Sequence, residues 1–221
     1  KEFKPDIYIG AEDIWGFNKY WEKKWWNKTN CMIWTTLDSE PILPLAIEAA
    51  DHVKNYFCWA SFAEKNMHKI GFKHVKTLRG IVESKHFYKL PQEDKTKLRE
   101  KFKIDSNCFL IGFVFRNQLR KSVPNLLDGF KKFCDENPNL NTKLLLHTSW
   151  AEGWDIPRLI KEKGIDEFKI LTTYFCNKCK NYEIKPFSGQ EKDCRFCKSE
   201  KSQNTITAAH GVSEKQLNEI Y

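Results

Sequence analysis

Two Cys-x2-Cys pairs separated by fourteen residues hold four of the eight cysteines of the chain. Each pair can place two thiolates on one tight turn, and two such turns offer the tetrahedral sulfur set that zinc prefers. Four sulfur ligands leave no open coordination position, so the spacing predicts a structural zinc ribbon and not a catalytic metal. The alternative is four ordinary reduced cysteines. The predicted ligands are Cys176, Cys179, Cys194 and Cys197.

The remaining cysteines stand singly in apolar stretches, where a thiol behaves as a small hydrophobic group. The first residues show no signal-peptide pattern, and no apolar run is long enough to cross a bilayer. We therefore expect a cytoplasmic protein in which paired cysteines bind metal instead of forming disulfides. Lys1 is not a start methionine and Tyr221 falls within a helical pattern, so we expect a segment of a longer protein.

Apolar, β-rich runs alternate with helical patterns along the rest of the chain, which predicts βα units and parallel sheets. The run 108–115 is almost continuously hydrophobic, as in a strand covered on both faces. Ser122 can cap the next helix, and Ser61-Phe-Ala-Glu64 and Ser213 with Gln216 form capping-box patterns. The expected strands are 7–9, 31–36, 56–59, 75–78, 108–115, 143–147 and 169–174.

Length and charge set the class of partner. The chain has 221 residues, of which 41% are hydrophobic, enough for one or two domains with buried cores. Its formal net charge of +8 favours anionic partners: nucleic acid, acidic membrane surfaces or phosphorylated small molecules. The charge alone does not choose among them.

A basic loop, 115–122, joins the most hydrophobic strand to the following helix. In open α/β sheets ligands bind at the carboxyl ends of strands, and a helix N-terminus favours an anion. Arg116 can grip a phosphate through two parallel hydrogen bonds, and Lys121 adds a point charge. The loop therefore predicts a phosphate site, with a solvated basic loop as the alternative.

This part of the chain resembles the opening of the donor domain in group 1 (family 4) glycosyltransferases. The likeness is carried by Leu110-Ile-Gly-Phe-Val-Phe-Arg-Asn-Gln-Leu-Arg-Lys121 and the helix after it. Other segments follow in the order of the family: Ala50-Asp-His-Val53, Gly80-Ile-Val-Glu83, Gly153-Trp-Asp-Ile-Pro157 and Gly211-Val-Ser213. The likeness covers nearly the whole chain except the zinc ribbon, which is interpreted as an insertion.

The resemblance implies the GT-B arrangement, an α/β fold with two Rossmann-like domains facing across a cleft. Residues 1–103 would then be the C-terminal part of the acceptor-side domain. Residues 104–221 would be the N-terminal part of the donor-binding domain, with the ribbon at 175–199. The implied activity is sugar transfer from a nucleotide-sugar to an acceptor (a saccharide, lipid or protein), usually with retained configuration.

Residue roles follow from the same resemblance. Arg116 and Lys121 match the family's basic pair on the donor diphosphate, where they would stabilise the leaving nucleotide without a catalytic divalent metal. Phe115 stands where a small residue usually precedes the arginine, and Arg79 stands where the family often has histidine. Asp38 matches the region where many members carry a histidine near the reaction centre. It is the candidate catalytic residue, with turn capping as the alternative.

The family's acidic donor-binding motif is expected beyond the last residue, so this chain is expected to be inactive alone. Two other functions remain open: a zinc-ribbon module that binds nucleic acid, which the long buried strands disfavour, and a non-catalytic glycosyltransferase relative. An aromatic and basic stretch, 15–28, indicates either core packing, which we favour, or stacking on sugars or peripheral membrane contact.

Overall fold

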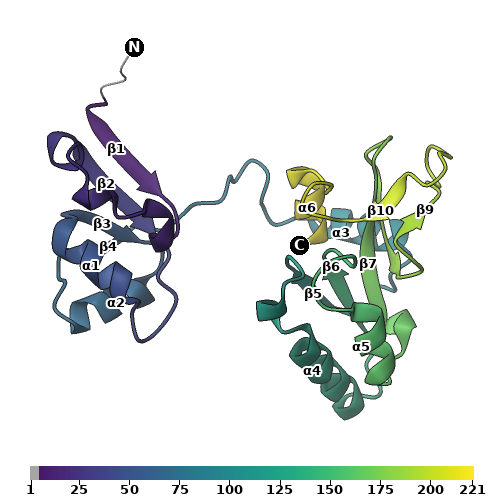
Figure 1. The fold of residues 1–221 in the computed structure, drawn as a ribbon. Helices are drawn as coiled ribbons and strands as arrows, with labels where there is room; N and C mark the ends of the chain where they lie inside the picture. The colour runs from purple at the N-terminus through teal and green to yellow at the C-terminus, as the bar shows by residue number, and fades with distance from the viewer. Residues whose placement is uncertain (1–4) are drawn as a thin grey trace. The chain divides into compact units, whose positions relative to one another are not determined.

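The computed structural model describes residues 5–221, and the chain forms two compact units, Lys1–Val82 and Glu83–Tyr221 (Figure 1). Both units are mixed α/β structures with parallel strands, in agreement with the predicted Rossmann-like class. The boundary lies before the expected position near residue 103. The reason is that Phe102 and Ile104 are buried in the core of the second unit.

The first unit is a four-stranded parallel sheet in the order β1-β2-β3-β4. Because the strands follow one another in sequence order, right-handed connections place the intervening segments on one face of the sheet. The strands are β1 (Ile7–Ala11), β2 (Asn30–Thr35), β3 (Asn55–Cys58) and β4 (Lys76–Thr77); the helices are α1 (Pro44–His52) and α2 (Ser61–Lys69).

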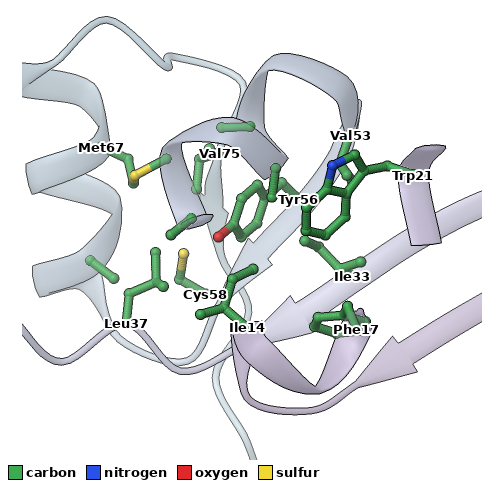
Figure 2. Packing of buried hydrophobic residues seen from close by; sticks show 14 of the residues in the cluster. Ile14, Phe17, Trp21, Ile33, Leu37, Val53, Tyr56, Cys58, Met67 and Val75 are labelled. Carbon is green, nitrogen blue, oxygen red and sulfur yellow. The ribbon is translucent and has the colours of Figure 1, made fainter. Parts of the chain in front are cut away.

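The core of the first unit lies between this sheet face and the connecting segments (Figure 2). Ile33 and Tyr56 point into it from β2 and β3, and Met67 of α2 belongs to the same buried cluster. The aromatic stretch forms short 3-10 turns, and its Phe17 and Trp21 are buried in this core. Core packing, the favoured interpretation of that stretch, accounts for these side chains.

The opposite face of the same sheet is more open. Ile7 and Ile9 alternate with the core-facing residues of β1 and are exposed. Trp34 and Trp59 stack at 4.0 Å between ring centroids, and the indole N–H of Trp34 donates to the carbonyl of Leu78 at 2.6 Å.

The second unit contains three parallel strands followed by antiparallel ones, in the order β5-β6-β7-β10-β9, with β8 paired to β7. Strand β7 is buried along its whole length. Its first half pairs with β6 and its last residues pair with β10. The strands are β5 (Phe109–Val114), β6 (Thr142–His147), β7 (Ile170–Cys176), β8 (Tyr182–Pro186), β9 (Glu191–Lys192) and β10 (Gln203–Thr205).

Two hydrophobic clusters flank this sheet. One includes α4 (Val123–Glu136) and α5 (Ile156–Glu162), and the other includes residues of α3 (Gln92–Lys101) and α6 (Glu214–Ile220). In α4 the buried residues Val123, Leu127 and Phe130 recur at helical spacing and form one apolar stripe. Among residues 5–221, none of the helices is both long enough and apolar enough to cross a membrane.

All seven expected strands are present, with ends shifted by one or two residues, whereas β8, β9 and β10 were not predicted. The capping box of Ser213 and Gln216 is confirmed. The capping box predicted at Ser61 is wrong. The N-cap residue of α2 is Ala60, and the Glu64 carboxylate accepts hydrogen bonds from Thr77 instead. Ser122 lies before α4 in a left-handed conformation and makes no side-chain cap hydrogen bond.

Candidate functional site

The four predicted cysteine ligands come together in the second unit, with their sulfur atoms within 4.8 Å of one another. Cys176 and Cys179 lie on the turn between β7 and β8, here called the first knuckle (176–179). Cys194 and Cys197 form the second knuckle (194–197), between β9 and β10. The pairs Cys176–Cys197 and Cys179–Cys194 have sulfur separations of 3.8 and 3.6 Å.

These separations fit a common metal ion. A tetrahedral zinc site with Zn–S bonds of about 2.3 Å places its sulfurs about 3.8 Å apart, and a disulfide would require about 2 Å. All eight cysteines are free thiols, in agreement with the interpretation of the sequence. The cluster can therefore hold one metal ion with four sulfur ligands.

Hydrogen bonds around the cluster favour thiolates. Burial of Cys176 opposes its ionisation, but hydrogen bonds from Ser202 and from backbone amides lower its pKa to about 6. A hydrogen bond from Ser199 lowers the pKa of Cys197. Burial raises the pKa of Cys194 to about 11, and the neighbouring cysteine sulfurs add to the increase. A bound divalent cation would reverse this last effect, because it stabilises all four thiolates at once.

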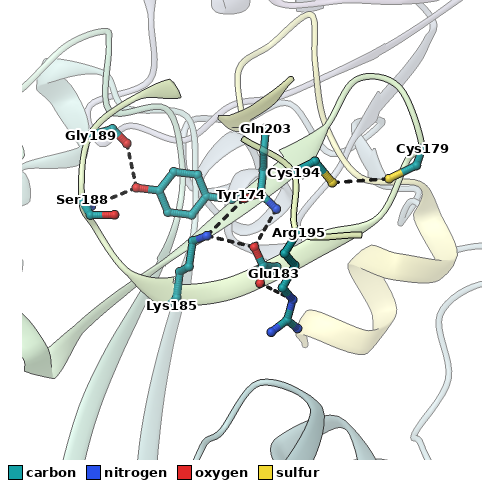
Figure 3. Close-up of polar contacts among 9 residues, drawn as sticks. All are labelled: Tyr174, Cys179, Glu183, Lys185, Ser188, Gly189, Cys194, Arg195 and Gln203. Atoms are coloured by element: carbon teal, nitrogen blue, oxygen red, sulfur yellow. Dashed lines mark hydrogen bonds and ion pairs between the residues drawn. The ribbon is translucent and has the colours of Figure 1, made fainter. Parts of the chain in front are cut away.

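A buried carboxylate connects the second knuckle to the sheet (Figure 3). The Glu183 side chain on β8 is only 6% exposed and pairs with Lys185 at 2.9 Å and with Arg195 at 2.5 Å. Gln203 of β10 donates a hydrogen bond to the same carboxylate at 2.8 Å. Burial opposes ionisation of Glu183, but its hydrogen bonds from Lys185 and Gln203 outweigh burial and lower its pKa. Arg195 belongs to the second knuckle, so this ion pair fixes the knuckle against β8.

The predicted phosphate loop follows the carboxyl end of β5 and leads into α4. Arg116 is 61% exposed, and its Nε lies 3.6 Å from Glu152 Oε2, an ion pair that solvent weakens. Lys121 is half-buried in a single 3-10 turn, and the rings of Phe115 and Phe113 pack at a tilt with centroids 4.3 Å apart. Both predicted basic residues therefore belong to one short loop beside the first turn of α4.

Asn117, which the sequence did not single out, holds this loop in place. Its side chain is buried, and its amide nitrogen is within hydrogen-bonding distance of the carbonyls of Ser149, Glu152 and Trp154. Its amide oxygen accepts from the backbone N–H of Trp154 at 3.1 Å. Gly153 has a positive φ of 68° and approaches the Asn117 backbone so closely that a side chain would not fit. The loops after β5 and β6 are therefore locked together at the carboxyl edge of the sheet.

His147, the last residue of β6, lies at the same edge and is buried. Its Nδ1 lies 2.9 Å from the Thr173 hydroxyl, and burial lowers its pKa to about 4. The imidazole is therefore neutral at physiological pH. The sequence showed His147 only as part of a strand, since a single histidine in an apolar run carries no site signal.

Asp38 lies in the first unit, just after the carboxyl end of β2, and is exposed. Its neighbour Leu37 is part of the core, and Ser39 donates to the carbonyl of Pro41 at 3.1 Å. Asp38 and the basic loop belong to different units of the chain.

No protein-family model matches the chain, and no curated protein matches it significantly. The fold and the cluster define a class: a mixed α/β protein with parallel-containing sheets and a four-cysteine site able to hold a metal ion. The resemblance to family 4 glycosyltransferases stays a prediction.

Proposed function

We propose that the second unit is the donor-binding part of a nucleotide-sugar glycosyltransferase and that Arg116 and Lys121 hold the donor diphosphate. The position of the basic loop carries this proposal. The loop lies between the carboxyl end of β5 and the first turn of α4, the edge at which α/β sheets bind ligands.

The chemistry asked of the loop is electrostatic. When the sugar leaves, negative charge develops on the nucleoside diphosphate, and Arg116 and Lys121 would stabilise it. The N-terminal turn of α4 would add its partial positive charge, since Ser122 makes no side-chain cap there. Phosphate would replace Glu152 as the partner of Arg116. Asn117 keeps the loop rigid, which lowers the entropic cost of binding.

For the transfer itself we propose that Asp38 orients the acceptor hydroxyl or accepts its proton. Its position after a parallel strand of the first unit is compatible with a ligand-facing residue. The acceptor class stays open among saccharide, lipid and protein.

We further propose that the four-cysteine cluster binds one zinc ion with a structural role. Four thiolates suit zinc, and the sulfur separations agree with tetrahedral coordination. Metal analysis of the purified protein is expected to find one zinc per chain. A protein with all four thiols titratable and no metal would refute this part of the proposal.

Thermal unfolding with and without uridine and guanosine diphosphates tests the donor site. A nucleotide at one hundred times its dissociation constant stabilises the folded protein by about 2.7 kcal/mol. We expect this shift to disappear in Lys121→Ala and Arg116→Ala. Arg120→Ala is the matched control, because it removes the same charge from the same loop without removing a proposed ligand. Equal loss in the control, or no shift with either nucleotide, would count against the donor site.

Nucleic-acid binding is the second candidate, favoured by exposed basic residues on the two knuckles or directly after them: Lys178, Lys180, Arg195 and Lys198. A divalent ion with four thiolates carries a charge of about −2, which offsets part of this positive charge. Titration with labelled RNA and DNA at several salt concentrations separates the two proposals. Tight binding that falls steeply with salt, without nucleotide stabilisation, would support a nucleic-acid-binding module.

A further inference from the structure

Helix α6 is attached by two hydrogen bonds to the residues that directly follow the first knuckle. The side-chain amide of Gln216 donates to the carbonyl of Lys180 at 2.8 Å. The hydroxyl of Tyr182, the first residue of β8, donates to the carboxylate of Glu219 at 2.7 Å. Lys180 directly follows the ligand Cys179, so the position of its carbonyl depends on the shape of the knuckle.

The conformation of Lys180 is one that a non-glycine residue adopts at a cost. Its φ is 61°, in the left-handed region. The turn is closed by a hydrogen bond from the Lys180 amide to the carbonyl of Cys176 at 3.0 Å. A metal ion bound to both Cys176 and Cys179 would fix the turn from its two sides and hold this strained residue in place. Loss of the metal allows Lys180 to relax and its carbonyl to turn away from α6.

The other side of α6 holds the first residues of the second unit. Asn218 is buried, and its amide oxygen accepts from the backbone N–H of Tyr88 at 3.1 Å. The ring of Phe87 meets the edge of Tyr221 with centroids 6.4 Å apart. A cavity of about 430 Å³ lies here, and its wall includes residues from 88–90, α3, β5 and α6. The position of α6 therefore determines one side of this cavity.

We propose that metal binding by the four cysteines controls the docking of α6 and thereby assembles this wall of the cavity. Gln216 and Tyr182 act as positioning residues between the cluster and the helix. Val212 and Ile220 also pack on the hydrophobic core, so α6 keeps part of its attachment without metal. The inference rests on the proposed metal binding and is independent of the glycosyltransferase activity.

Hydrogen–deuterium exchange of the zinc-loaded and chelator-treated protein tests the proposal, after metal analysis of both samples. Removing zinc is expected to accelerate exchange about thirtyfold in α6 and in 86–90, as loss of two hydrogen bonds predicts. Amides of β5 and β6 serve as the reference and are expected to stay protected. Bound zinc with unchanged exchange in α6 would overturn this inference alone. A protein that binds no metal would overturn the zinc proposal as well. Equal acceleration in β5 and β6 would also overturn the inference, because it would show that the metal stabilises the whole second unit and not α6 in particular.

The variant Gln216→Glu tests the hydrogen bond between Gln216 and Lys180 while leaving the four cysteines intact. A glutamate keeps the capping box, because its carboxylate still accepts from the Ser213 amide. Glutamate lacks the N–H group that donates to the Lys180 carbonyl, and it places a carboxylate oxygen against that carbonyl oxygen. We expect zinc to stay bound while exchange in α6 accelerates, by less than in the metal-free protein because the Tyr182–Glu219 hydrogen bond remains. Gln92→Glu, the same change at the exposed start of α3, is the control and is expected to leave exchange in α6 unchanged. Unchanged exchange in α6 of zinc-loaded Gln216→Glu would refute the role of this contact.

Discussion

Replacement of Asn117 gives a direct test of how the two loops at the carboxyl edge of the second sheet are held. The side chain is 1% exposed, so water cannot easily replace its partners. Its two amide hydrogens are shared among three backbone carbonyls, and its oxygen accepts a third hydrogen bond from Trp154. At about 1 kcal/mol per hydrogen bond, Asn117→Ala is expected to lower the free energy of unfolding by about 3 kcal/mol.

Asn117→Asp has nearly the same shape and should be worse. Its second oxygen would face the three carbonyls that now receive hydrogen bonds, and the buried carboxylate would lose its hydration. We expect a loss of more than about 4 kcal/mol, or protonation of the aspartate. Asn125→Ala is the control, because Asn125 is exposed in the first turn of α4. It should change stability by less than about 0.5 kcal/mol.

Native-state hydrogen exchange of β5 and β6 amides measures the unfolding free energy of the second unit alone. Tryptophan fluorescence would mix the two units, since most of the eight tryptophans lie in the first. If Asn117→Asp were as stable as the native protein, the amide nitrogen would not be the group facing the carbonyls. If Asn117→Ala matched the Asn125→Ala control, the buried hydrogen bonds would contribute nothing to stability.

Three further predictions concern charge and metal. Below pH 6.5 the unfolded chain protonates His147 but the folded chain does not, because burial lowers its pKa to about 4. The unfolding free energy should fall by about 3 kcal/mol between pH 6.5 and 4, and less in His147→Gln, as measured by exchange of β6 amides. Glu183→Gln should weaken zinc binding about tenfold in chelator competition, whereas Glu191→Gln, on an exposed residue, should not. Cys197→Ser should lower the zinc content to less than one ion per chain in metal analysis, and Cys134→Ser should leave the zinc content unchanged.

The parallel strands could be predicted because apolar runs leave a strong sequence signal. β7 has no exposed residue, as expected of a covered strand, whereas β5 is apolar almost throughout but lies at the edge of the sheet and has no fully buried residue, so the expected cover on both of its faces is not found. β9 and β10 are short and polar, and β8 alternates apolar with charged residues over only five positions; all three are strands because they pair with β7 or with one another. Long-range pairing of this kind leaves little trace in a local pattern.

Capping boxes show how tertiary contacts override a local signal. At Ser213 the pattern formed because Gln216 had no stronger competitor for its oxygen. At Ser61 the same pattern failed because Glu64 accepts from both the backbone and the hydroxyl of Thr77. Asn117 and Glu183 were missed for a related reason. Their hydrogen-bonding partners include residues far along the chain, so nothing near them in sequence marks them as buried.

The spacing of the cysteines predicted their convergence, but not how deeply the region is built into the second unit. An insertion could be removed without disturbing the sheet that carries it. Here Tyr174 and Phe175 of β7 are buried, and they pair with β8 and β10 on the two sides of the strand. The Tyr174 hydroxyl also accepts from the Ser188 amide and donates to the carbonyl of Gly189, which fixes the loop before β9. Deleting 177–202 would expose these aromatic rings and leave half of β7 unpaired, so the cysteine-bearing hairpins belong to the core of the unit.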